Sequence, residues 1–418
     1  MREVSLIEIL DARERRVAAQ QRLLAQYKKP LVGLNMNIAG PVKRSGLSDL
    51  AFRAAMDALR AKLGGALLHM ELTDAPTGLE AILVCDLPAR ELKALAMTLE
   101  TAQPVGRLYD LDVIDVDGNK LSRPTPRTCL VCGGPVGPCA RSRAHGLDAI
   151  QAATEKLLQD FAAVHLADLA VGTLIDEVDL TPKPGLVDRR NTGAHTDMDL
   201  PMFHRSARAL RPYFQTAAAL GMESDDCMKS LQQAGLLAEE TMLTATGGVN
   251  THKGAVYAVG ILLAALGGVL VRGGDVFARC AALAKAGLPP TKNTHGSLVK
   301  ARYGASGARG EALAGFPQAR MAQRALRRHK GDAIPALLTL LSQVEDTNLL
   351  HRGGTEGLQL VQREAAAILA GPADRYADQM QVLDDLCIAK NLSPGGSADL
   401  LALALLLDRT REIWETDM

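Results

Sequence analysis

A dense group of charged and polar residues stands near the middle of the chain. The string from Glu177 to Asp197 contains Lys183, Asp188 and Arg189 together with two prolines. Proline cannot continue a helix, so we expect a helix to end near Glu177 and a rigid loop to carry the rest. Functional residues favour loops of this kind. A solvated connector is the alternative, but it would not need so much mixed charge.

A glycine-rich string follows at residues 246–254 and includes Lys253. It is not a P-loop, because the lysine precedes the last glycine and no serine or threonine comes after it. A glycine-rich turn that opens a helix still offers backbone N–H groups to a phosphate, with Lys253 beside them.

The string from Glu345 to Gly354 brings together oxygen ligands and a cation. Asp346 and Asn348 suit Mg²⁺, and Arg352 suits a phosphate. We expect a helix to end here, with Gly353 or Gly354 as its cap. The alternative is a polar helix end that faces water.

The last polar string, residues 393–399, precedes an apolar helical pattern. It predicts Ser397 as the N-cap of that helix. Asp399 is either a favourable first-turn charge or a catalytic carboxylate.

Three weaker clusters lie in the first third of the chain. The segment Asn35–Arg44 reads as a strand that enters a Gly-Pro turn, where Lys43 and backbone N–H groups could hold a phosphate. A solvated basic loop explains it equally well.

Asp110 and Asp112 form the second cluster, close after Arg107. Residues two apart on a strand share a face, so these carboxylates would repel each other unless a cation such as Mg²⁺ lies between them. The exposed face of an edge strand is the alternative. Asp115, Asp117 and Gly118 read as the hairpin turn beyond it.

The third cluster contains Cys129, Cys132, Cys139 and His145, which could bind zinc. The ligand spacing is short, and reduced cysteines are often simply buried. We therefore favour another interpretation, in which Arg141, Arg143 and His145 contact phosphate or a carrier protein.

Hydrophobic periodicity predicts the strands and helices that hold these residues in position. Residues 1–150 alternate short strands and helices, which indicates an α+β or α/β module. Residues 151–418 are rich in alanine and leucine at helical spacing, which indicates an all-α module. The expected strands are 31–37, 81–86 and 106–116. The expected helices are 7–26, 49–62, 89–99, 151–176, 201–220, 254–266, 336–348, 358–370 and 397–408.

The composition excludes several classes of protein. Basic and acidic residues both number 47 and aromatic residues make up 3%, which argues against nucleic-acid binding. The apolar stretch 258–270 is short and interrupted by glycine, which argues against a membrane span. Seven cysteines and a charged amphipathic N-terminal segment favour the cytoplasm.

The C-terminal strings together resemble one family of enzymes. They are Thr-Pro-Lys-Pro-Gly-Leu-Val-Asp at 181–188, Gly-Val-Asn-Thr-His-Lys-Gly at 248–254, Asp-Thr-Asn at 346–348 with Arg-Gly-Gly at 352–354, and Ser-Pro-Gly-Gly-Ser-Ala-Asp-Leu-Leu at 393–401. This pattern is similar to that of the triphosphoribosyl-dephospho-CoA synthases. The resemblance implies a reaction of ATP with 3′-dephospho-CoA that releases adenine.

The N-terminal strings resemble the apo-citrate lyase phosphoribosyl-dephospho-CoA transferases. They are residues 37–43, 107–112 and 129–145, in the same order along the chain, with Ala39 where the family pattern has proline. The resemblance implies transfer of the product of the other module to a serine of the citrate lyase acyl-carrier (gamma) subunit, with release of pyrophosphate.

The two resemblances assign roles to the candidate residues. Glu177 is expected to be the catalytic base, with Asp399 as the alternative; Asp110 and Asp112 are expected to serve the transferase. Mg²⁺ is expected on Asp346, Asn348 and Asp188, and on Asp110 with Asp112. The expected phosphate contacts are Lys183, Arg189, Lys253 and Arg352 in one module, and Lys43, Arg107, Arg141 and Arg143 in the other.

Two alternatives stay open at this stage. A sister synthase serves malonate decarboxylase, so the synthase module alone would leave the pathway undecided. A non-catalytic CoA-binding module for carrier maturation is the other alternative, although a binding relic need not keep two carboxylates on one strand.

Overall fold

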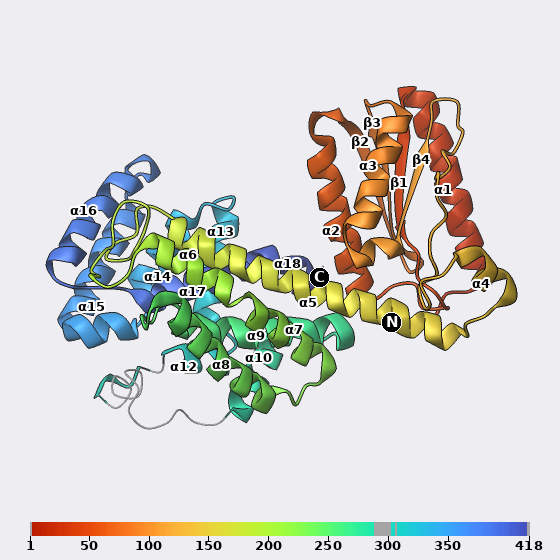
Figure 1. The fold of residues 1–418 in the computed structure, drawn as a ribbon. Helices are drawn as coiled ribbons and strands as arrows, with labels where there is room; N and C mark the ends of the chain where they lie inside the picture. The colour runs from red at the N-terminus through yellow and green to blue at the C-terminus, as the bar shows by residue number, and fades with distance from the viewer. Residues whose placement is uncertain (1, 288–301, 306, 416–418) are drawn as a thin grey trace. The chain divides into compact units, whose positions relative to one another are not determined.

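The computed structural model describes residues 2–287, 302–305 and 307–415 (Figure 1). The chain divides into two compact units, Met1–Ala162 and Ala163–Met418. The division falls inside helix α5, Leu147–Asp179. The module boundary expected near residue 150 stays a prediction.

The first unit is built on a four-stranded sheet with the strand order β2-β3-β1-β4. All its described pairings are antiparallel, so the unit is α+β and the α/β alternative is wrong. The sequence did not predict β2, because that edge strand is mostly half-exposed and carries polar residues. The strands are β1 Leu31–Met36, β2 Leu67–Ala75, β3 Gly78–Cys85 and β4 Tyr109–Ile114.

Helices cover this sheet (Figure 1). Leu23 of α1 packs on Leu31, Val84 and Ile114. Val32 and its cross-strand partners point away from that face and are fully buried too, since α2 and α3 also pack against the sheet. The helices of the unit before α5 are α1 Leu6–Tyr27, α2 Gly46–Leu63, α3 Ala89–Ala102 and α4 Val136–Ser142.

The expected strand 106–116 is shorter in the structure. Residues Pro104–Leu108 form a 3₁₀ turn (η2), and β4 begins only at Tyr109. Asp110 and Asp112 are half-buried and alternate with buried neighbours, so the prediction that they share a face is confirmed.

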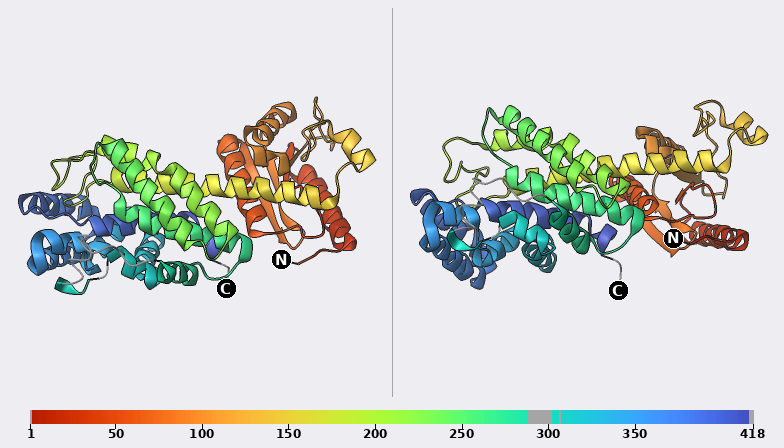
Figure 2. Two further views of the ribbon diagram at one scale, coloured as in Figure 1. Left: turned by 60° about the horizontal axis from the view of Figure 1, so that its bottom comes forward. Right: turned by 90° about the horizontal axis from the view of Figure 1, so that it is seen from below.

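All described regular elements of the second unit are helices, as the alanine-leucine pattern predicted (Figure 2). After α5 they are α6 Leu200–Ala209, α7 Arg211–Glu223, α8 Met228–Thr246, α9 Lys253–Arg272, α10 Val276–Ala286, α12 Gly307–Leu313, α13 Pro317–Arg328, α14 Ala333–Gln343, α15 Thr347–Ala370, α16 Tyr376–Ala389, α17 Gly395–Arg409 and α18 Arg411–Trp414.

Helix α9 forms the centre of this unit. It is long and apolar enough to cross a membrane, so the expectation that this stretch is too short was wrong. However, 78% of its most apolar window is buried inside the protein, as in a core helix. It packs closely on α7: a Cβ added at Gly221 would lie 1.8 Å from the carbonyl oxygen of Ala264.

Three differences from the predicted helices involve a break or a cap. The expected helix 201–220 breaks at Leu210 into α6 and α7, and Pro212 lies in the first turn of α7. The expected helix 336–348 ends at Gln343, and Asp346 is the N-cap of α15 rather than part of the end of the preceding helix. Helix α15 is interrupted at Gly354, where φ is +60°.

Ser397 is not an N-cap. Helix α17 begins at Gly395, and Ser397 lies in its first turn. Its backbone N–H and its hydroxyl both donate to Asp346.

Candidate functional site

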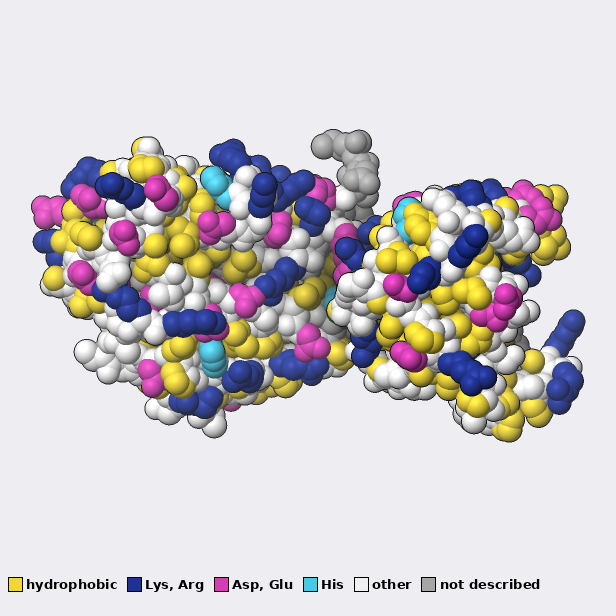
Figure 3. Space-filling view, turned by 90° about the horizontal axis from the view of Figure 1, so that it is seen from above, with side chains coloured by type: hydrophobic (Ala, Val, Ile, Leu, Met, Phe, Trp, Pro, Cys, Tyr) yellow, Lys and Arg dark blue, Asp and Glu magenta, His cyan; other side chains and the backbone are white. Residues whose placement is uncertain are grey.

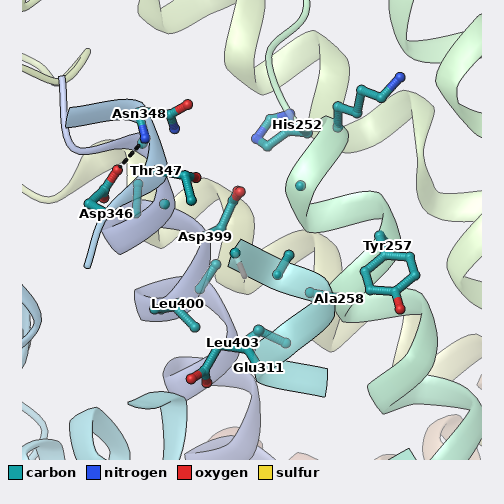
Figure 4. Close-up of a pocket in the computed structure, with 18 of the residues that line it drawn as sticks. His252, Tyr257, Ala258, Glu311, Asp346, Thr347, Asn348, Asp399, Leu400 and Leu403 are labelled. Carbon is teal, nitrogen blue, oxygen red and sulfur yellow. Dashed lines mark hydrogen bonds between the residues drawn. The ribbon is translucent and has the colours of Figure 1, made fainter. Parts of the chain in front are cut away.

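The second unit contains a cavity of about 1950 Å³. It lies among the end of α5, the loop that follows α5, and the N-terminal turns of α9, α15 and α17, with α12 on one side (Figure 4). Single-ligand pockets measure roughly 300–1,000 Å³. This cavity is therefore large enough for two nucleotide-sized molecules.

Buried carboxylates organise the loop after α5. Asp188 Oδ2 accepts from the backbone N–H of Lys183 at 2.9 Å, and Oδ1 accepts from those of Arg190 and Asn191 at 2.7 and 3.1 Å. Asp188 does not line the cavity. Its oxygens hold the loop together, which leaves them little capacity for Mg²⁺.

Asp384 of α16 fixes the same loop from outside it. It accepts from the Gly185 N–H at 2.8 Å, from the Asn191 amide at 2.8 Å and from the Arg190 guanidinium at 3.3 Å. The side chain is fully buried, and burial raises its pKa. No sequence pattern indicated this residue, since it lies about 200 positions from the loop and outside every polar string.

Glu177 and Lys183 form a buried ion pair that lines the cavity. Lys183 Nζ lies 2.6 Å from Glu177 Oε1, and both side chains are almost fully buried. Burial raises the pKa of Glu177, whereas the ammonium of Lys183 opposes that rise. Lys183 was expected to hold a phosphate; here its charge is matched by Glu177.

Asp346 connects the start of α15 to the start of α17. Oδ1 accepts from the N–H groups of Asn348 and Leu349, and Oδ2 accepts from the N–H and hydroxyl of Ser397 at 2.7 and 2.9 Å. The carboxylate is buried, burial raises its pKa, and all four of its usual acceptor positions are engaged.

Asp399 lies one turn further along α17 and faces the cavity (Figure 4). A Cβ at Gly254 would lie 1.9 Å from its Oδ2, so the glycine at the start of α9 makes room for this carboxyl group. Burial, with the charges of Glu177 and Asp346 adding to it, raises the pKa of Asp399 to about 8. The group is therefore protonated at neutral pH.

His252 lies on the other side of the same space (Figure 4). Its Nδ1 is 2.8 Å from Ser206 Oγ, which itself accepts from the Thr251 hydroxyl at 2.7 Å. Ser206 thus donates to Nδ1, which places the ring proton on Nε2. Burial lowers the pKa of His252 to about 3, and Nε2 is buried without a hydrogen-bond partner among the described residues. The sequence string contained this histidine without indicating a role.

Of the other three residues expected to contact phosphate, two line the cavity and one does not. Lys253 lines the cavity and pairs with Glu239 at 2.7 Å. Arg352 also lines it and donates to Ala194 O at 2.8 Å and Asn391 Oδ1 at 2.9 Å. Arg189 lies outside the cavity lining and pairs with Asp179.

The described lining of the cavity is acidic overall. It contains seven acidic side chains and four cations; Asp399 is protonated at neutral pH, and burial raises the pKa of Glu311 to about 7, so the other five acidic groups carry most of the negative charge. A cavity of this charge repels a polyphosphate unless a divalent cation accompanies it. The carboxylates are Glu177, Asp197, Glu239, Glu311, Glu345, Asp346 and Asp399, and the cations are Lys183, Lys253, Arg309 and Arg352.

Substitution of Asp399 and of Asp346 by asparagine is expected to change the Tm in opposite directions. The pKa of Asp399 in the folded state is about 8, against about 3.9 in an unfolded chain, so the free energy of unfolding falls as the pH rises between these values. We expect Asp399→Asn to raise the Tm by at least about 3 °C at pH 8, since it removes this cost. We expect Asp346→Asn to lower it by about 5 °C, or about 2 kcal/mol, because its amide would meet the donors of Ser397.

Calorimetry of the two variants at pH 6 and pH 8 measures both shifts. A loss of stability in Asp399→Asn that is equal at the two pH values would contradict the account of its burial.

The first unit has a smaller cavity of about 180 Å³ between α1 and the sheet. It is lined by Asp110, Glu80 and Asn35 of three neighbouring strands and by Arg13 and Arg16 of α1. Burial raises the pKa of Asp110, and the nearby Asp112 adds to the rise. Arg16 pairs with Glu80 at 3.2 Å.

The other candidates of this unit lie around that cavity or away from it. Lys43 lines it and donates to Ile38 O at 2.6 Å. Asp112 is outside the lining and pairs with Lys120 at 2.5 Å. Arg107 donates to Thr128 O. Arg141 and Arg143 are exposed on and after α4.

Lysine and arginine side chains are interspersed with acidic ones on the molecular face drawn in Figure 3. The cavity of the second unit, large enough for two nucleotide-sized molecules and lined by buried carboxylates, is the candidate active site of an enzyme with large substrates. The comparison with known proteins specifies it further. The chain belongs over residues 163–418 to the family described as ATP:dephospho-CoA triphosphoribosyl transferase, and residues 4–161 match the family described as apo-citrate lyase phosphoribosyl-dephospho-CoA transferase.

Individual relatives agree with this assignment. The protein CitXG of Haemophilus influenzae is 37% identical, and the match covers 96% of each chain. A probable 2-(5″-triphosphoribosyl)-3′-dephosphocoenzyme-A synthase of Azotobacter vinelandii is 42% identical over 59% of this chain and 91% of its own length. The corresponding synthase of Haemophilus ducreyi is 37% identical over 66% of this chain and 98% of its own.

Proposed function

We propose that the second unit transfers the triphosphoribosyl group of ATP to the 2′-hydroxyl of 3′-dephospho-CoA, with Asp399 as the acid and Glu177 as the base. The first unit then transfers the phosphoribosyl-dephospho-CoA part to a serine of the citrate lyase acyl-carrier (gamma) subunit. The product of one unit is thus the substrate of the other. The observation that carries the proposal is the pair of carboxyl groups in contrasting surroundings on the wall of one cavity.

The chemistry at the ribose needs a proton acceptor and a proton donor. The substrate 2′-oxygen forms a bond to C1′ of the ATP ribose as the bond from C1′ to adenine breaks, through an oxocarbenium-like transition state. Glu177 takes the proton of the 2′-hydroxyl, and Asp399, protonated at neutral pH, gives its proton to the departing adenine. Direct displacement accounts for the inversion from a β-nucleotide to an α-ribosyl product that the family resemblance implies.

Two neighbours position these groups. Lys183, 2.6 Å from Glu177, favours the ionised carboxylate that a base requires. His252 offers its Nε2–H, which has no partner among the described residues, to a substrate acceptor on the same side of the cavity.

Polyphosphate binding in this acidic cavity calls for a divalent cation together with Lys253 and Arg352. Mg²⁺ would neutralise phosphate charge. Asn348 fits as a ligand, because its exposed side chain lines the cavity, and Glu345 is exposed beside it on the same segment. Asp346, expected as a ligand, has its oxygens engaged and instead fixes the segment that carries Asn348.

For the first unit we propose that Asp110 accepts the proton of the carrier serine. The serine oxygen bonds to the innermost phosphorus of the triphosphate while the bond to pyrophosphate breaks. Arg13, Arg16 and Lys43, which line the same cavity, would attract the charge of the departing pyrophosphate.

The pH dependence of adenine release tests the acid–base assignment. We expect kcat/KM to fall about tenfold per pH unit above about pH 8, as Asp399 loses its proton, and to fall at low pH as Glu177 gains one. Initial rates between pH 5 and 10 with Mg²⁺, ATP and 3′-dephospho-CoA measure it. A rate that keeps rising through pH 9 would exclude Asp399 as the acid.

A further inference from the structure

The cysteine and histidine cluster of the first unit has the geometry of a metal site. One ligand atom from each of Cys129, Cys132, Cys139 and His145 can be chosen so that all four lie within 4.8 Å of one another. Cys132 Sγ and Cys139 Sγ are 3.6 Å apart. Tetrahedral zinc with Zn–S bonds of about 2.3 Å places sulfur atoms about 3.8 Å apart.

The backbone between Cys129 and Gly134 forms a tight turn. The Gly133 N–H donates to Cys129 O at 3.0 Å, and the Cys129 N–H donates to Gly134 O at 2.6 Å. Gly133 has φ +71°, a conformation that favours glycine. This turn brings Cys129 and Cys132, two of the four candidate ligands, close together.

Simple burial does not explain the cluster. The four cysteines outside it (Cys85, Cys227, Cys280 and Cys387) are all buried, whereas Cys132 is exposed and Cys139 is half-exposed. Nε2 of His145 is buried and has no hydrogen-bond partner among the described residues. A histidine with a buried, unpaired ring nitrogen, grouped with three cysteines, is explained by one metal ion that all four residues bind.

The segment also lacks a hydrophobic core of its own. Helix α4 has no buried residue, and Val131 and Val136 are each 37% exposed. Small segments without a core are commonly held by a metal or a disulfide. Arg127 ties the start of the segment to β4 through Tyr109 O at 2.7 Å, but the part from Cys132 to His145 needs another constraint.

We propose that Cys129, Cys132, Cys139 and His145 bind one Zn²⁺ in a closed, structural site. Three sulfur ligands and one imidazole suit zinc and do not suit Mg²⁺ or Ca²⁺. The metal holds α4 in place, and α4 carries Arg141 with Arg143 directly after it. The site thereby fixes two exposed cations of the transferase unit that would otherwise lie on an unsupported segment.

Zinc content of the purified full chain tests the proposal. Protein produced in zinc-supplemented medium and purified without chelator is expected to contain about one zinc per chain. Cys132→Ser and Cys139→Ser are expected to lower this at least about tenfold, whereas the matched control Cys280→Ser, in the other unit, leaves it unchanged. Far-ultraviolet circular dichroism checks that each variant is folded.

Cobalt provides a second readout that does not depend on a variant. Exchange of the bound metal for Co²⁺ should give the visible bands of tetrahedral cobalt together with thiolate charge transfer. Wild-type chain with reduced thiols and no zinc would overturn the proposal. So would a chain two hydrogens lighter because Cys132 and Cys139 form a disulfide, or zinc retained by both ligand variants.

Discussion

Asp399→Asn is expected to lower adenine release from ATP and 3′-dephospho-CoA by about 10²- to 10⁴-fold. Asparagine keeps the size of the side chain and can still donate a hydrogen bond, but it cannot give a proton to the departing base. The raised pKa of Asp399 keeps its proton available for that transfer at neutral pH. Chromatographic measurement of free adenine under saturating substrates detects the loss.

A matched control lies in the same cavity. Asp197 also lines it but is largely exposed, 62% by its side chain, and has no part in the proposed chemistry. Asp197→Asn should stay within about threefold of wild type. An Asp399→Asn variant with near-normal adenine release and an unchanged pH profile would remove Asp399 from the mechanism.

Asp110→Asn is expected to abolish labelling of the carrier subunit, by about 10²-fold or more, while adenine release continues at the wild-type rate. The Asp110 carboxyl group lies in a cavity lined by three cations, and the amide that replaces it in the variant cannot accept a proton. The increase in mass of the carrier subunit measures transfer, and free adenine measures the other reaction in the same tube.

Asp117→Asn is the control for this variant, since Asp117 is an exposed residue of the hairpin turn after the same strand. It should leave both reactions intact. If Asp110→Asn and Asp117→Asn transfer equally well, Asp110 is not the proton acceptor; if Asp110→Asn loses both reactions, the two units do not work as separate sites.

Much of the site could be predicted from local sequence. The strings that begin at Glu177, Thr246, Glu345 and Ser393 are separated by tens of residues, yet each contributes side chains to one cavity. Helix-breaking prolines and glycine-rich turns bring polar residues to the ends of helices, and the ends of packed helices meet. Residue type and spacing were sufficient to select these strings.

The roles of the individual residues within these strings depend on tertiary structure. Asp188 and Asp346 looked like metal ligands, but they accept backbone hydrogen bonds, which no sequence pattern reveals. Asp384 organises the loop from a distant helix. The raised pKa of Asp399 results from burial beside two other carboxylates, and that arrangement exists only in the folded chain.

The proximity of the cysteines in the first unit also could not be predicted from the sequence. The short spacing of the four candidate ligands along the chain counted against a zinc site. Helix α4 begins at Val136, and its first turn brings Cys139 Sγ to within 3.6 Å of Cys132 Sγ. A distance in sequence was a poor guide to a distance in space.

The most direct test of the central claim uses the whole chain with ATP, 3′-dephospho-CoA, Mg²⁺ and purified citrate lyase acyl-carrier subunit. We expect pyrophosphate in an amount equal to the carrier labelled, adenine in at least that amount, and little labelling of a malonate decarboxylase carrier offered in parallel. Absence of free adenine, with or without the carrier, would contradict it.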